Sequence, residues 1–124
     1  MNKAILSLIT AAPIVWGACA ATVPPPVQRM ADAESAQRSA RELGANNEPS
    51  AQLSLKLADE QIAEARAAIK AGENQRAEGL LIRAKADAEL AIAKAREKNA
   101  QVAGKDAVTD AAAQKATNVG QGAM

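Results

Sequence analysis

The sequence predicts an all-α fold: a small antiparallel three-helix bundle or helical hairpin with a long third helix. Roughly a quarter of the residues are alanine, which has the highest helix propensity, whereas Phe and Tyr are absent and Trp occurs once. Apolar residues recur at spacings of three and four in three segments that glycine, proline and asparagine separate. A chain of 124 residues holds a single domain, and an alanine-rich core buries little apolar area, so we expect modest stability.

The first predicted helix covers residues 27–43. Glu34, Arg38 and Glu42 alternate in sign at i,i+4 spacing, which supports a helix. Gly44 is a typical C-terminal stop, and residues 45–48 are expected to form a polar loop. The positions expected to face the core are Met30, Ala33, Ala36 or Gln37, Ala40 and Leu43.

Pro49 and Ser50 begin the second predicted helix, which continues to Ala71 and stops at Gly72. Leu53 and Leu57 fall on its far side, where we expect the first helix to cover them. The positions expected to face the core are Ala51, Leu55, Ala58, Ile62, Ala65 and Ile69.

The third predicted helix runs from about Gln75 to Val102, with Asn74 as its N-cap. Gly79 inside this helix is expected to permit close packing. The apolar pattern weakens afterwards, so residues 28–103 are expected to form the domain and residues 104–124 a weakly ordered or helical tail. The stripe expected to face the core is Ala77, Leu81, Ala84, Ala88, Ala91 and Ala95, with Leu80 and Ile92 at its margins.

A second apolar stripe lies nearly opposite on the third helix and consists of Ile82, Ala86, Leu90 and Ala93. Because the neighbours in a three-helix bundle cover adjacent faces, one of the two stripes should stay at least partly exposed. The first helix wraps round to cover this stripe, or its two scattered large apolar residues need no explanation. The alternative is that the stripe binds a partner helix or a second copy. Ile82, Ala86 and Leu90 are therefore the candidate partner surface.

Residues 1–18 have the features of a secretory signal peptide. Lys3 supplies a positive charge, an apolar run extends from Ala4 to Trp16, and small residues follow it. A run of about a dozen residues is too short for a hydrocarbon core of about 30 Å, which needs about twenty. We therefore expect the protein to be exported to the periplasm.

Cys19, the sole cysteine, has no intramolecular disulfide partner. Gly17 and Ala18 before it resemble the lipobox of bacterial lipoproteins, which implies that Cys19 carries lipid and tethers the chain to a membrane. Trp16 departs from this pattern, which usually has an aliphatic residue there. The alternative is cleavage after Ala20 by the ordinary signal peptidase, which would remove Cys19. Ala20 is not the aspartate linked with inner-membrane retention, so we expect the outer membrane.

A proline-rich linker, residues 19–27, joins the cysteine to the bundle. Pro24, Pro25 and Pro26 favour extended polyproline II at about 3.1 Å per residue. The linker is therefore expected to hold the domain away from a membrane surface.

The residue types of common catalytic and metal sites are missing from this sequence. It has no histidine, and the cysteine is expected to be acylated or removed, which excludes Cys/His, Ser/His/Asp and zinc sites. Carboxylate pairs such as Asp59 with Glu60, or Asp87 with Glu89, lie among surface charges without an apolar pocket to shift their pKa. We expect no cofactor and no enzymatic activity.

The composition also argues against nucleic acid as a partner. The 15 basic and 14 acidic residues are interleaved, whereas nucleic-acid binding requires a one-sided basic surface. No aromatic residue follows Trp16 to stack on bases.

A family resemblance extends over about residues 30–98. Residues 53–64, Ala71-Gly72-Glu73, Arg76-Ala77-Glu78 and residues 83–91 follow a recurring alanine-rich arrangement. It resembles the helical lipoproteins of Gram-negative bacteria grouped as domain of unknown function 4398. This resemblance implies a periplasmic or outer-membrane location, sometimes beside a peptidoglycan-binding domain of the OmpA type.

We therefore expect a membrane-tethered, non-catalytic structural or interaction module of the cell envelope. Its expected partners are the membrane, through the N-terminal lipid, and an envelope or peptidoglycan-associated protein. The alternative is an oligomeric, coiled-coil-like spacer or scaffold similar to the murein lipoprotein, with association between copies of the chain.

Overall fold

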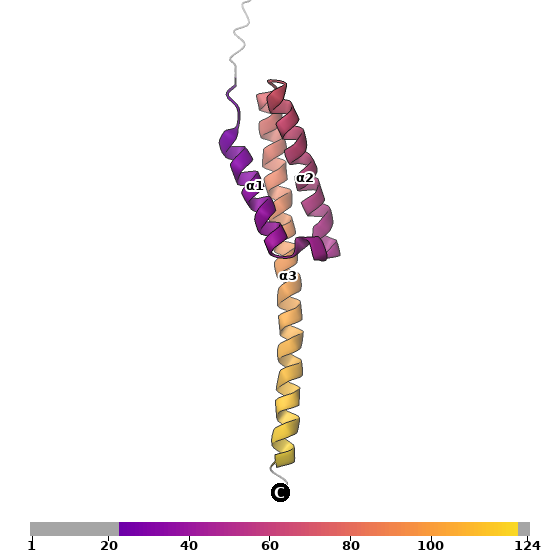
Figure 1. The fold of residues 1–124 in the computed structure, drawn as a ribbon. Helices are drawn as coiled ribbons and strands as arrows, with labels where there is room; N and C mark the ends of the chain where they lie inside the picture. Colours follow the sequence, from indigo (N-terminus) through magenta and orange to yellow (C-terminus); the bar gives the residue numbers. More distant parts are fainter. Residues whose placement is uncertain (1–22, 122–124) are drawn as a thin grey trace, which may run out of the picture.

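The computed structural model describes residues 23–121, which form three α-helices and one short 3-10 turn around an alanine-rich core. Helix α1 (Val27–Glu42) is followed by η1 (Ala45–Asn47), α2 (Pro49–Lys70) and α3 (Asn74–Gln121). Figure 1 shows α1 and α2 lying beside the first half of α3, with α2 antiparallel to both neighbours. The predicted all-α bundle with a long third helix is confirmed.

A tight turn at Pro26 directs the chain into α1. The N–H of Val27 donates to the carbonyl of Pro25 (2.9 Å), and Pro26 has φ −81° and ψ 62°, the values of an inverse γ-turn. The polyproline II expectation is therefore wrong at Pro26, because ψ there is far from the extended value of about +145°. The side-chain amide of Asn74 donates to the carbonyl of Val23 (2.6 Å), which holds this segment against the start of α3.

Glycines end the first two helices, as the sequence predicts. Gly44 has φ +85° and Gly72 has φ +77°, a left-handed conformation that residues with a Cβ rarely adopt. After α2, the N–H of Gly72 donates to Ile69 (3.0 Å) and that of Glu73 to Ala68 (2.9 Å). These two bonds form a Schellman motif, which satisfies carbonyls at the helix end and reverses the chain.

The N-cap expected at Asn74 is wrong. Helix α3 already includes Asn74, and the carbonyl of Glu73 accepts the N–H of Ala77 (3.0 Å). The Asn74 amide instead bonds to the carbonyl of Val23, so it contributes to tertiary structure rather than to helix capping.

The core is built from the helix faces that the periodicity predicts. One cluster surrounds Leu81, the largest fully buried side chain, and a second lies towards η1 and the middle of α3. The whole predicted stripe of α3 is buried, as are five of the six predicted positions of α2, with Ile69 half-buried. The fully or nearly fully buried alanines that join α2 to α3 are Ala51, Ala58, Ala65, Ala68, Ala77, Ala84, Ala88, Ala91 and Ala95.

Leu53 and Leu57 do not join this core. Leu53 is 62% exposed and Leu57 is 38% exposed. Helix α1 packs mainly against α3, so it leaves this side of α2 uncovered, and the expectation that it covers both leucines is wrong.

Polar side chains connect the helices at the edges of the core. Arg66 pairs with Glu34 (2.6 Å), and Arg41 pairs with Asp59 (2.6 Å), which joins α2 to α1. Between α2 and α3, the amide of Gln61 donates to a carboxylate oxygen of α3 (2.6 Å). These contacts are largely exposed, so they specify how the helices are arranged more than they stabilise the fold.

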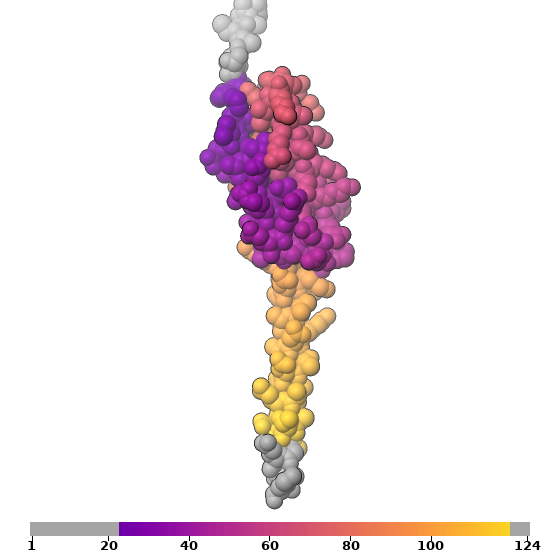
Figure 2. All heavy atoms as spheres, in the orientation of Figure 1, coloured from indigo at the N-terminus to yellow at the C-terminus, as the bar shows by residue number. Residues whose placement is uncertain are grey.

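Helix α3 extends far beyond the bundle. It has 48 residues, hence a length of about 72 Å at 1.5 Å per residue, and does not end near Val102 as the sequence suggests. Residues 100–121, here called the arm, project beyond α1 and α2 (Figures 1 and 2). Every side chain from Ala100 to Val119 is exposed. The many alanines keep this segment helical, because a single internal glycine such as Gly104 costs only about 1 kcal/mol.

Candidate interaction surface

The second apolar stripe of α3 faces away from both neighbouring helices. Ile82 is 49% exposed and Leu90 is 47% exposed, and Ala86 and Ala93 are exposed as well. Helix α1 therefore does not wrap round to cover them, and the prediction that one stripe stays exposed is confirmed. The candidate partner residues Ile82, Ala86 and Leu90 lie together on one straight helix.

This stripe continues in both directions, which sequence reasoning missed. The exposed positions that follow it at spacings of three and four, here called the outer seam, are Gly79, Ile82, Ala86, Leu90, Ala93, Ala100 and Gly104. Only Glu97 interrupts them. The seam crosses from the bundle into the first part of the arm.

The two glycines of the outer seam have open space beside them. Apart from the two neighbouring residues and the adjacent backbone of α3 itself, no atom of the described chain lies within 4 Å of the position that a Cβ would take at Gly79 or at Gly104. The expectation that Gly79 permits close packing is therefore wrong within this chain, because α1 and α2 lie on the other side of α3. Each glycine leaves a small notch in the seam instead.

Charged residues border the outer seam on both sides. On the side of α2, Asp87 accepts a hydrogen bond from Gln61 (2.6 Å) and Lys94 donates to Ser54 (3.1 Å). On the side of α1, Lys85 and Glu89 form a long i,i+4 ion pair (3.8 Å). The charged residues beside the middle of the seam are Arg83, Asp87 and Lys94 towards α2, and Lys85, Glu89 and Arg96 towards α1.

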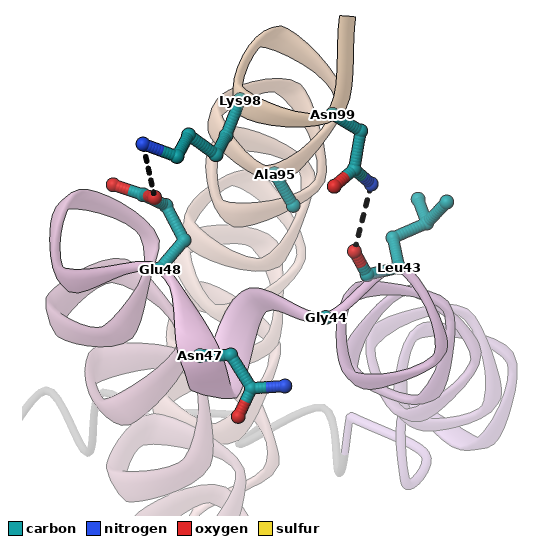
Figure 3. A pocket seen from close by; sticks show the side chains of 7 residues that line it. All are labelled: Leu43, Gly44, Asn47, Glu48, Ala95, Lys98 and Asn99. Atoms are coloured by element: carbon teal, nitrogen blue, oxygen red, sulfur yellow. Dashed lines mark hydrogen bonds and ion pairs between the residues drawn. The ribbon is translucent and has the colours of Figure 1, made fainter. Parts of the chain in front are cut away.

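A small hollow lies where α3 leaves the bundle, and Figure 3 shows its lining. It measures about 170 Å³ and lies between η1 and α3. Lys98 Nζ lies 3.9 Å from Glu48 Oε2, and Asn99 donates to the carbonyl of Leu43 (3.2 Å). The hollow is smaller than typical ligand pockets, and these contacts already engage the side chains of Glu48, Lys98 and Asn99.

Two of the carboxylates that the sequence places in pairs, Asp59 and Asp87, accept hydrogen bonds from other helices of the described chain. Asp59 accepts hydrogen bonds from Gln37 and Arg41, and Asp87 accepts one from Gln61. At the start of α3 the pKa of Arg76 is raised, first by its hydrogen bond to Glu73 (2.9 Å) and then by the charge of that carboxylate. Residues 23–121 contain no group of three carboxylates placed to hold a metal ion.

The comparison with known families agrees with the resemblance. Residues 28–107 match the family described as Domain of unknown function (DUF4398). The chain belongs to this family. The DUF4398 match includes α1, α2, the bundle half of α3 and the first part of the arm, so the whole outer seam lies within it. No curated protein and no solved structure matches this DUF4398 chain.

The predicted lipidation site, Cys19, and the signal peptide of residues 1–18 lie outside the described residues. Within residues 23–121, no helix is both long and apolar enough to cross a membrane.

Proposed function

We propose that this protein is a membrane-tethered, non-catalytic interaction module of the bacterial cell envelope. In this proposal the chain is exported to the periplasm, Cys19 carries the lipid anchor in the outer membrane, and the bundle presents α3 to an envelope or peptidoglycan-associated partner. One observation carries the interaction role: the outer seam exposes Ile82 and Leu90 on a helix that α1 and α2 support from behind. Apolar side chains spaced along one helix face are the usual anchors for a second helix.

The length of α3 favours a second candidate function, that of an envelope spacer or scaffold. Val23 is bonded to Asn74 at the start of α3, and the arm points away from that end (Figure 1). A chain tethered through its N-terminus would therefore place the tip of the arm about 70 Å from Val23, four residues after the tether.

The anchor is tested by metabolic labelling with palmitate in bacterial cells. We expect the exported chain to take up label and to sediment with membranes. We expect the Cys19→Ala variant to lose both, because several acyl chains on one cysteine account for stable anchoring. A mature protein that begins at Ala21 and carries no lipid would contradict this part of the proposal.

The interaction surface is tested by replacing its two large anchors together. Ile82→Glu with Leu90→Glu should leave helicity intact, because both side chains are half exposed, but should abolish crosslinking to partners in intact cells. The matched control is Leu53→Glu with Leu57→Glu, two exposed leucines of α2 outside the seam. If the seam variant unfolds, Ile82 and Leu90 belong to the core. If both variants crosslink as the unmodified chain does, the seam binds nothing.

A further inference from the structure

The shape of the outer seam fits another helix better than it fits a compact ligand. The seam extends from Gly79 to Gly104, about 38 Å along a straight helix, and consists of small side chains around Ile82 and Leu90. Glycine and alanine allow helix axes to approach at the short end of the usual 8–10 Å range. A compact ligand would leave most of this length exposed, whereas a helix would cover it.

The sizes of the seam residues are self-complementary when two copies of α3 run antiparallel. A twofold axis between Ala91 and Ile92 places each large residue against a small one, and such an axis makes every contact occur twice. The facing pairs are Leu90 with Ala93, Ile82 with Ala100, and Gly79 with Gly104. A parallel pair would instead place Leu90 against Leu90 and Ile82 against Ile82.

The charges beside the seam agree with the same register. Because the axis brings the same border of both helices together, oppositely charged residues lie within about one helical turn of each other across the contact. These pairs are Arg83 with Glu97, Asp87 with Lys94, and Glu89 with Arg96. Lys85 lies on the same border as Glu89 and at the same distance along the axis from Arg96, so the contact of Arg96 combines one attraction with one repulsion. Within residues 23–121, Arg96 forms no ion pair, so it is available to the Glu89 of a second copy. A parallel pair would place Glu97 against Glu97.

We infer that the partner of the outer seam is a second copy of this chain, bound antiparallel through α3. This inference rests on the proposed interaction role of the same face and names its occupant. The contact is about 38 Å long and roughly 10 Å wide, a footprint of roughly 400 Å² per copy, which is small for a specific interface. The dimer is therefore weak and transient.

Disulfide crosslinking between two differently tagged full-length chains tests the register. We expect Ile82→Cys in one chain and Ala100→Cys in the other to form a mixed-tag disulfide, because the two positions face each other. Ile82→Cys in both chains should give only background, since the two cysteines would lie about 28 Å apart, and a disulfide requires Cα atoms within about 7 Å. The controls are the unmodified pair, which retains Cys19, and Leu53→Cys with Ala100→Cys.

A charge reversal tests the border contacts in the purified full-length chain. Glu89→Lys should weaken dimerisation about tenfold in sedimentation equilibrium, because it places like charges together at two symmetric sites. Glu89→Lys combined with Arg96→Glu should restore the affinity of the unmodified chain, since the pairs are re-formed with exchanged signs. Helicity measured on the same samples shows that each variant is folded.

The outcomes separate this inference from the proposed function. Stronger crosslinking between two Ile82→Cys chains than between an Ile82→Cys chain and an Ala100→Cys chain would overturn the antiparallel register. If neither combination crosslinks, a second copy of the chain is not the occupant of the seam. In both cases palmitate labelling and partner crosslinking of the unmodified chain would still decide the proposed function. If the mixed-tag disulfide forms but the chain takes up no palmitate, the dimer inference stands and the lipid anchor is rejected.

Discussion

Replacing Leu81 by alanine is expected to lower the free energy of unfolding by about 2–5 kcal/mol. Leu81 is fully buried and lies in the cluster formed by all three helices. Its neighbours are mostly alanines, which have no side-chain length with which to fill the cavity that the substitution leaves. Since small domains are stable by only about 5–15 kcal/mol, this single change removes a large part of the total.

Urea unfolding followed by circular dichroism measures this loss. The control is Leu53→Ala, the same chemical change at a leucine of α2 that is 62% exposed, where we expect a loss within about 0.5 kcal/mol. Equal losses for the two variants would show that Leu81 is not the centre of the core.

Enlarging Ala88 to leucine is expected to cost about 1–3 kcal/mol. Ala88 is fully buried and lies on α3 between Ala84 of one core cluster and Ala91 of the other. A leucine there would force α3 away from its neighbours, because an alanine-lined interface holds the helices close together.

Thermal unfolding compares Ala88→Leu with Ala63→Leu, which adds the same atoms at an exposed position of α2. We expect only the first variant to unfold at a lower temperature. A more stable Ala88→Leu variant would mean that the contact is loosely packed and that the core contains space for a larger side chain.

The sequence predicts those parts of the fold that depend on local periodicity. The stripe from Ala77 to Ala95 is buried as expected, and Gly44 and Gly72 end helices because only glycine adopts a positive φ readily. The position of α1 cannot be predicted from local periodicity. It depends on which of its neighbours, α2 or α3, offers α1 the larger contact surface. For that reason Leu53 and Leu57 were assigned to an interface that does not exist in the described chain.

The candidate surface could be predicted only in part. Ile82 and Leu90 stand out because they are large, but the continuation through Ala100 to Gly104 depends on α3 remaining helical past Val102. Glu97 also interrupts the apolar pattern, so periodicity alone does not join the two halves. The role of the Asn74 side chain could not be predicted, because its partner, the carbonyl of Val23, is distant in sequence.

An antiparallel dimer would change how a tethered chain is oriented. The two N-terminal ends would lie about 50 Å apart, at opposite ends of the paired helices. Two copies anchored in one membrane would then lie along its surface, whereas a single copy is able to stand upright. Dimerisation and the upright spacer are therefore competing states of one molecule.

The alanine core also determines how the stability of this domain depends on temperature. The heat capacity increment of unfolding arises mainly from newly hydrated apolar surface, at about 0.45 cal/mol/K per Å². Alanine methyls bury little of that surface, and every side chain of the arm from residue 100 to residue 119 is exposed. The increment per residue should therefore fall below the usual 12–15 cal/mol/K, which gives a flat stability curve, a small unfolding enthalpy and a broad thermal transition. Such a domain loses structure gradually on heating and keeps most of its small stability on cooling.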